Sequence, residues 1–332
     1  MDWFPLRLAL SRDSTTQKRP RIKRSCRWDD EGVASTVGTI MSLMVFLTAM
    51  GMFTNQFVPV WMSDNESAHM SDAIGEFVTL KSQIDGVIVD YANELLAPAP
   101  IFVPITLSAE GIPVFAASTA GILKYSPASL SDYPWFNITY ASDEYTVSPA
   151  TDGSAGGYLE LYCPNRYYVE QWLVYEAGAV ILNQSNGEFI IAGPQFAVSN
   201  FVSGSTVARV VKITQLDMLG INRTIGGMGS KGVNADVLYA STTAYNSSAG
   251  TDLTFSIVTQ HGTAWENYFK KQLNSSMADL IYGVDFTVTK VKTTVGGWMT
   301  DYYTVTVTIS EVNVLDHSRA TVQMSIGELG GA

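Results

Sequence analysis

Cysteine and charge are both scarce in this chain of 332 residues. Two cysteines allow at most one disulfide, which excludes a disulfide-stapled small domain and a zinc cluster of several cysteines. Charged residues make up 15% of the sequence and hydrophobic residues 46%, so the chain is too apolar for a disordered polymer. The net charge of −11 would repel nucleic-acid phosphates, so we expect no nucleic acid among the partners.

Motifs for catalysis, cofactors and metals are also scarce. The glycine cluster 226–232 matches G-x-G-x-x-G, but a strand pattern follows it where a dinucleotide-binding fold needs a helix. None of the three histidines has the neighbours of a zinc motif. Cys163, which lies between Tyr162 and Pro164, is typical of a small core residue. We therefore expect no enzyme, no cofactor and no metal site.

The charge that is present divides sharply near Gly32. Residues 1–32 carry eight basic and five acidic residues, net +3, whereas the remaining 300 carry 12 basic and 26 acidic residues, net −14. No charged residue occurs from Gly32 to Ser63. Val33–Phe53 alone would form a helix of about 31 Å, enough to span a bilayer. The basic cluster before this span places residues 1–32 in the cytoplasm and everything after it outside the cell.

Three interpretations of the apolar segment differ in where the chain is cut. A secretory signal peptide would be cleaved after the small pair Ala49 and Gly51, but the basic region is long for such a signal and the apolar run continues beyond it. An uncut signal anchor would leave a single-pass membrane protein. In the third interpretation, the cut lies before the helix.

The junction reads Asp-Asp-Glu-Gly-Val-Ala-Ser-Thr over residues 29–36, and the apolar run starts directly after Gly32. It resembles the class III signal sequence of archaeal type IV pilins and pilin-like surface proteins. In that family a prepilin peptidase cuts on the cytoplasmic side and leaves the helix on the mature protein. The resemblance implies that Gly32 is the last leader residue and Val33 the first mature one. Glu31 stands where the family usually has a basic residue, and Val37 where bacterial pilins carry a glutamate.

A second region is similar to the extracellular part of archaeal pilin-like membrane proteins. It runs from Tyr175 to Thr263 and includes the Glu176–Val180 turn, Gly193-Pro194 and the glycine cluster. This resemblance implies family membership and supplies no activity. The partners it implies are the membrane, further copies or homologous pilin subunits, the prepilin peptidase and the pilus assembly machinery.

In a filament of this kind, apolar helices from many subunits pack together, and small residues allow them to approach closely. The expected packing residues are Val37, Gly38, Ile40, Ser42, Leu43, Met44, Leu47 and Gly51.

An amphipathic pattern follows the apolar span. From Met70 to Leu95 the apolar residues recur every three or four positions, interrupted only by Lys81, which predicts a helix with one apolar face. Pro98 and Pro100 are expected to end it, and Pro59 to kink its junction with the apolar span.

Beyond Pro100 the apolar period changes from about 3.6 to 2. Residues 303–309 alternate between apolar and polar, and the alternation changes parity after Glu311, which predicts a β-bulge. Segments 284–288 and 320–326 alternate in the same way, and a turn is expected at 316–318, which makes a three-strand meander.

The predicted fold class is α+β: a long N-terminal hydrophobic and amphipathic helix, then a mainly β, sandwich-like head with one short helix. The capping-box spacing of Thr263 and Glu266 predicts the start of that short helix. The expected segments are a cytoplasmic leader (1–32), a transmembrane or filament-core helix (33–62), an exposed amphipathic helix (63–98), an extracellular head (99–327) and a flexible tail (328–332).

Six N-x-[ST] sequons lie on the predicted outer side, which is typical of a glycosylated envelope protein. They are Asn65, Asn137, Asn183, Asn222, Asn246 and Asn274. The sequence therefore favours a structural or adhesive pilin-like subunit of the cell membrane and cell surface. The alternatives are an uncleaved single-pass receptor or ligand-binding module, and a membrane-anchored enzyme whose catalytic residues converge from distant positions.

Overall fold

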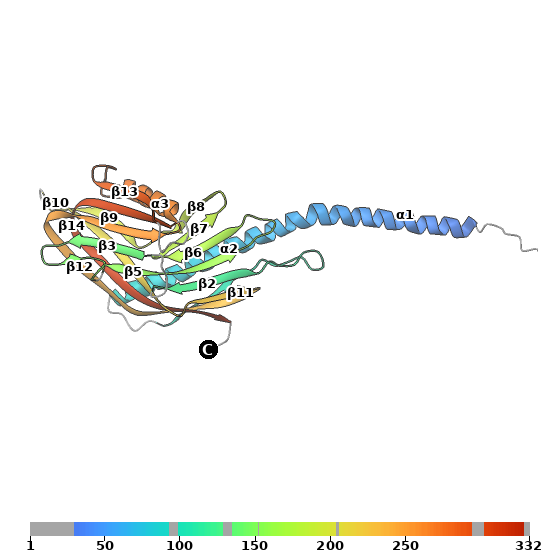
Figure 1. The fold of residues 1–332 in the computed structure, drawn as a ribbon, viewed down its shortest axis with the longest axis horizontal. Helices are drawn as coiled ribbons and strands as arrows, with labels where there is room; N and C mark the ends of the chain where they lie inside the picture. The colour runs from blue at the N-terminus through green and yellow to red at the C-terminus, as the bar shows by residue number, and fades with distance from the viewer. Residues whose placement is uncertain are drawn as a thin grey trace, which may run out of the picture. The chain divides into compact units, whose positions relative to one another are not determined.

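The fold is α+β, as the sequence predicts. The computed structural model describes residues 30–92, 99–128, 135–151, 153–203, 206–293 and 302–328. These residues form a helical N-terminal stretch, a mixed sheet of 14 strands and one short helix (Figure 1). The chain divides into two units, residues 1–53 and 54–332, which are considered separately below.

The N-terminal helical stretch consists of α1 (Asp30–Met52), a π-helical turn η1 (Phe53–Phe57) and α2 (Val58–Ala92). Pro59 lies two residues beyond the π turn. Proline donates no N–H, and its ring clashes with the carbonyl four residues earlier in a regular α-helix. A π turn is one way in which a helix adjusts to such an interruption. The irregularity expected at Pro59 therefore takes the form of a π turn just before it.

The sheet contains strands of very different length. Their bounds are β1 Ile101–Thr106, β2 Gly121–Pro127, β3 Trp135–Ala141, β4 Thr146–Val147, β5 Ser154–Cys163, β6 Gln171–Glu176, β7 Ala179–Gln184, β8 Gly187–Ala192, β9 Phe196–Ser203, β10 Thr206–Gly220, β11 Arg223–Gly227, β12 Ser230–Thr259, β13 Phe286–Thr293 and β14 Tyr302–Glu328. The main path runs β8-β7-β6-β5-β3-β12-β14-β10-β9, with the remaining strands paired at its sides. Among the described strands, β10 and β14 form the one parallel pair.

Two long antiparallel strands, β12 and β14, run through the head and contribute residues to both of its cores. Their register is interrupted between Asn246 and Thr251, where Gly250 and Glu311 adopt positive φ angles of 74° and 55°. The bulge predicted at Glu311 is therefore confirmed. The turn predicted at 316–318 is wrong, because these residues continue β14 and pair with both β12 and β10. The expected meander thus contains one long strand in place of two short ones.

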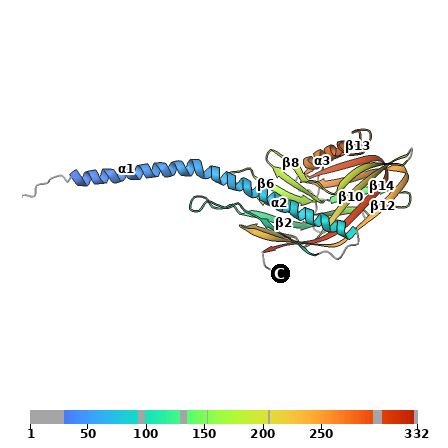
Figure 2. The ribbon, with the colours of Figure 1, turned by 180° about the vertical axis from the view of Figure 1, so that it is seen from behind.

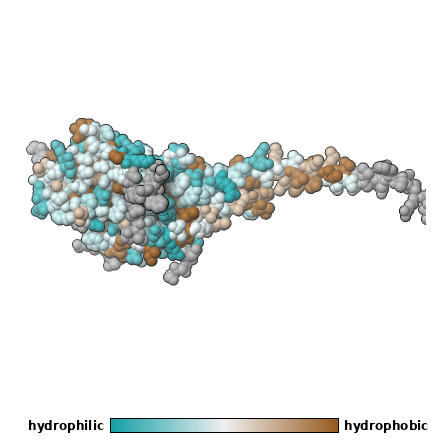
Figure 3. All heavy atoms as spheres, viewed as in Figure 1, coloured by the Kyte–Doolittle hydropathy of each residue, from teal (hydrophilic) through white to brown (hydrophobic). Residues whose placement is uncertain are grey.

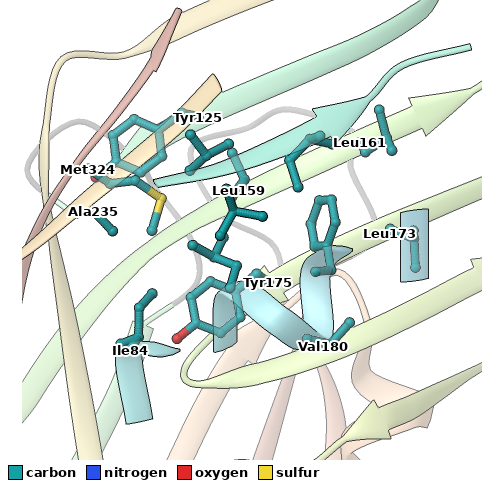
Figure 4. Packing of buried hydrophobic residues seen from close by; sticks show 14 of the residues in the cluster. Ile84, Tyr125, Leu159, Leu161, Leu173, Tyr175, Val180, Ala235 and Met324 are labelled. Carbon is teal, nitrogen blue, oxygen red and sulfur yellow. The ribbon is translucent and has the colours of Figure 1, made fainter. Parts of the chain in front are cut away.

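The first core lies under α2. Ten strands contribute to this cluster or its edge, and α2 packs against β1 and β12. Figure 2 shows α2 in front of the sheet. The buried face of α2 includes Phe77, Ile84 and Ile88, which confirms the predicted amphipathic pattern. Lys81, the charged residue in that pattern, forms an ion pair with Asp85 one turn later. Figure 4 shows Ile84 among the packed side chains of this core.

The second core lies under the short helix α3 (Gly262–Asn274), which buries Trp265, Phe269 and Leu273. The predicted capping box is wrong. The helix begins at Gly262, and the amides of Thr263 and Ala264 donate to Glu188 on the distant strand β8, at 2.6 and 3.2 Å. Glu266 instead forms ion pairs with two lysines. A non-local carboxylate therefore takes the place of the local cap.

Glu66 on α2 attaches the helix to the loop after β5. Its side chain is completely buried and accepts backbone N–H groups from Arg166, Tyr167 and Tyr168, at 3.1, 2.8 and 2.6 Å. A carboxylate that accepts several backbone N–H bonds is well satisfied without a basic partner. This contact fixes the first turns of α2 on the head.

We expect Glu66→Ala to lower the free energy of unfolding by roughly 3 kcal/mol, because three backbone N–H groups lose a charged acceptor and the buried side chain is removed. Urea denaturation followed by tryptophan fluorescence measures this loss. Asp72→Asn is the matched control, since Asp72 lies on the exposed face of the same helix. Equal stability of the two variants would contradict the role given to Glu66.

Candidate functional site: an exposed apolar helix

Helix α1 is the most unusual surface of the chain, because its apolar side chains are exposed along its described length. Val37, Ile40, Leu43, Met44 and Leu47 are between 50% and 65% exposed. Brown, hydrophobic spheres mark this helix in Figure 3, whereas the visible face of the head is mostly white and teal. The helix is long and apolar enough to cross a membrane or to serve as a signal sequence.

Helical geometry separates the predicted packing residues onto two faces. At about 100° per residue, the large residues fall within an arc of about 120°, and Gly38 and Ser42 lie on the opposite side. The large face consists of Val37, Ile40, Leu43, Met44 and Leu47, with Gly51 in the same arc. The small face consists of Ser35, Gly38, Ser42 and Ala49. A Cβ atom placed on Gly38 would meet no other atom within 4 Å. No single contact can therefore use all eight predicted residues.

The polar side chains of α1 suit an apolar environment. The hydroxyl groups of Thr39 and Thr48 donate to the backbone carbonyls of Thr36 and Met44, each at 2.8 Å. Hydroxyls that bond within their own helix need no water. The predicted cleavage residues Gly32 and Val33 lie in the first turn of α1, whose helical backbone begins at Asp30. The leader before residue 30 lies outside the described residues.

The six sequon asparagines differ in accessibility. Asn222, Asn246 and Asn274 are exposed, whereas Asn65, Asn137 and Asn183 are only half-exposed. Asn137 lies in β3 between β12 and β5 and pairs with Ser256 and Ser154. The side-chain amide of Asn65 donates to the carbonyl of Glu110 at 3.2 Å.

The groups considered for chemistry are each engaged in the core. Burial raises the pKa of the Cys163 thiol to about 12, so the thiol is neutral and a poor nucleophile at neutral pH. His69 contacts the Thr106 carbonyl at 2.9 Å, and His317 contacts the Gln215 side chain at 2.7 Å. Within the described residues, no group of three or more His, Cys, Asp and Glu side chains is placed to hold a metal ion.

A buried polar cluster under α3 was not anticipated from the sequence. Glu176 on β6 accepts hydrogen bonds from the Thr259 hydroxyl at 2.6 Å and the Trp265 indole at 2.7 Å. His261, which precedes α3, lies with its Nδ1 atom 3.3 Å from the Glu188 carboxylate. Sequence spacing gave no signal for this cluster, because its members lie up to 89 residues apart.

The cluster shifts the pKa of each of its three titratable groups. Burial raises the pKa of Glu176, although the His261 charge and the two hydrogen bonds oppose this. Burial is the largest single influence on the pKa of His261 and of Glu188, and it opposes their charged forms. Their mutual hydrogen bond, the nearby charges and, for Glu188, the hydrogen bonds from Thr263 together outweigh it. The pKa of His261 is therefore raised above 6.5 and that of Glu188 lowered below 4.5. Both shifts favour the charged pair, an imidazolium next to the Glu188 carboxylate.

Comparison of the chain with protein family profiles, with curated proteins and with solved structures finds no match. The fold and the exposed helix define a protein with a β-sheet domain preceded by an apolar helix that can serve as an anchor or a signal.

Proposed function

We propose that the chain is a structural or adhesive subunit of the cell surface, held by α1 and assembled into a pilus-like filament after cleavage before Val33. The exposed apolar surface of α1, which carries no charge from Gly32 onward, is the observation that carries this proposal. A helix that exposes this much apolar surface requires lipid or other apolar helices around it.

The two faces of α1 support assembly into an open polymer. The large face of one copy fits against the small face of the next, since small residues let two helix backbones approach closely. Because the two contacting surfaces differ, such packing is heterologous, and heterologous contacts form rings or helical filaments rather than closed dimers. The net charge of −14 beyond the leader keeps neighbouring heads soluble and apart.

An uncleaved single-pass receptor is the second candidate, and a hollow in the head favours it. A cavity of about 250 Å³ lies between loop 142–145 and residues 243–246 of β12. Its lining includes Tyr145 and Tyr245, whose rings stack with centroids 6.0 Å apart, and two acidic side chains. Polar groups beside an aromatic face suit a small polar ligand.

The N-terminus of the protein purified from its native membrane distinguishes the two candidates. We expect mass spectrometry to find Val33 as the first residue, and to find the leader retained when the prepilin peptidase is absent. An intact Met1 in the wild type would contradict the pilin-like proposal and leave the receptor as the better candidate.

We expect glycans at the three exposed sequons, Asn222, Asn246 and Asn274, and none at Asn137. Asn137 is only partly exposed and lies in a strand paired on both sides, whereas N-linked glycans are carried by surface loops. Intact glycopeptide mass spectrometry of the native protein measures the occupancy of each site. Full occupancy of Asn137 would show that modification precedes folding of the head.

A further inference from the structure

The loop between β1 and β2 carries an exposed apolar tip. Val114 is 99% exposed, and the neighbouring Phe115 is also exposed. Val114 has a φ angle of 71°, a conformation that is strained for a β-branched residue. A valine with a strained backbone and a fully exposed side chain contributes no buried contact to the head, so its apolar surface is available to another partner.

The tip is held in place by its own hydrogen bonds. The amides of Phe115 and Ala116 donate to the Ile112 carbonyl at 3.1 and 2.9 Å, and the Gly111 amide donates to the Ser118 hydroxyl at 3.0 Å. A Cβ atom on Gly111 would lie 2.5 Å from the Ala116 carbonyl oxygen, so the turn requires glycine there. The loop therefore presents Val114 in a defined position.

The base of the loop lies next to the first turns of α2. Asn65 of α2 donates to the Glu110 carbonyl, and the Leu107 amide donates to the Gly229 carbonyl at 2.9 Å. Met228, which is exposed, lines the same surface hollow as the loop. In both ribbon views the loop extends from the sheet toward the N-terminal end of α2 (Figures 1 and 2).

The chemistry of this end of the head matches a lipid interface. Residues 111–123 contain no charge, and the end of η1 and the start of α2 expose Phe57, Val60 and Trp61. Aromatic and aliphatic side chains without charge partition at the boundary between headgroups and acyl chains. No Lys or Arg lies in residues 33–80 or 111–123, so the apolar segments themselves offer no cation to anionic lipid and the contact proposed below is an apolar one.

We infer that the tip of loop 111–118 inserts Val114 and Phe115 into the membrane interface and forms a second lipid contact of the head. This inference rests on the proposed anchoring of α1. Insertion removes the apolar side chains of the tip from water, and this second contact restricts the rotation of the head relative to the bilayer.

The test uses the full chain with Cys26→Ser, in which the remaining Cys163 is buried. Val114→Cys reports on the loop, Ser42→Cys on α1, and Met277→Cys, at a position 91% exposed, is the water-exposed control. Each variant is labelled with an environment-sensitive fluorophore and reconstituted in phosphatidylcholine vesicles with and without spin-labelled lipid. Circular dichroism of each labelled variant checks the fold.

We expect lipid quenching at positions 42 and 114 to exceed that at 277 by at least about twofold, at low and high salt alike. Quenching at 42 without quenching at 114 would overturn the loop inference and leave the anchor intact. Absence of quenching at both positions would overturn the anchor and the inference with it. The label at position 114 could instead report an apolar environment that increases with the protein-to-lipid ratio and is not quenched by spin-labelled lipid. That result would assign the tip to a contact with a second copy of the chain and would also overturn the inference.

Discussion

Val37→Asp combined with Ile40→Asp is expected to abolish filaments and to release the chain from the membrane fraction. Both residues lie on the large face of α1 and are exposed in the isolated chain. An aspartate at the centre of a membrane-spanning helix costs roughly 3 kcal/mol, and less toward the ends. Ile40 lies near the centre of the predicted span and Val37 in its first turns, so the two changes together disfavour burial of α1 by a factor of at least about 10². Electron microscopy of the cell surface and fractionation of membranes measure the two losses.

The matched control is Ile40→Leu, which keeps the size and hydrophobicity of the side chain. Met277→Asp adds a charge to an exposed position on the head and should leave both readouts unchanged. Filaments that persist in the double aspartate variant would show that α1 does not form the filament core.

Gly38→Leu separates the two roles of α1. This change adds apolar volume to the small face, so insertion into lipid is retained while close approach of a neighbouring helix is blocked. We expect membrane association at the wild-type level together with loss of filaments. If filaments form normally, the large and small faces of α1 do not pack against each other.

The predictable parts of the fold are those governed by local spacing. The burial of Phe77, Ile84 and Ile88 follows from a period of three and four residues within one helix. The bulge at Glu311 follows from a change of parity within one strand. In each case the residues that carry the signal are neighbours in the chain, so no knowledge of the tertiary structure is needed.

The parts that sequence reasoning missed depend on contacts between distant residues. Residues 316–318 have the polar composition of a turn, but His317 is buried because Gln215, 102 residues away on β10, supplies its hydrogen bond. The start of α3 was misassigned because Glu188 satisfies its first amides from another strand. A single sequence contains no sign of such pairings.

The exposed apolar surfaces also include one that local sequence predicts and one that depends on the tertiary structure. The absence of charge from Gly32 to Ser63 is enough to predict an apolar helix, whereas the eight packing residues were predicted as one set and fall on two faces of α1. The loop at Val114 is different, since residues 111–123 have the composition of an ordinary buried segment. Only the topology, which places this loop outside the sheet, identifies it as an exposed surface.

His261→Gln is expected to destabilise the head by about 3 kcal/mol near pH 6, with a smaller effect near pH 9. Glu188 and Glu176 face His261 from β8 and β6, and the negative charge of Glu160 on β5 acts in the same direction. Together they raise the pKa of His261 above 6.5 despite its burial. A raised pKa contributes stability that is fully present below pH 6.5 and is lost as the pH rises through the pKa of the folded protein.

The carboxylates of Glu188 and Glu176 determine how the stability of the head changes with pH on the acidic side. The lowered pKa of Glu188 contributes stability above pH 4.5 that is lost as the pH falls through its folded value. Glu176 has the opposite sign: its raised pKa favours the protonated form, so its contribution is present below pH 4.5 and is lost at higher pH. Ionised Glu176 therefore depends on the imidazolium of His261, and deprotonation of His261 leaves the buried Glu176 and the partly buried Glu188 without their cation.

The measurement is the free energy of unfolding by urea between pH 5 and pH 9 for the wild type, His261→Gln, Glu188→Gln and the double variant. The coupling energy between the two positions should be largest near pH 6 and decline toward pH 9, because the ion pair exists only while His261 is protonated. Glu188→Gln should also lower stability at every pH, since the amides of Thr263 and Ala264 lose a charged acceptor. A coupling energy that stays constant from pH 5 to pH 9 would mean that the cluster acts through packing and neutral hydrogen bonds, and that His261 carries no charge in the folded head.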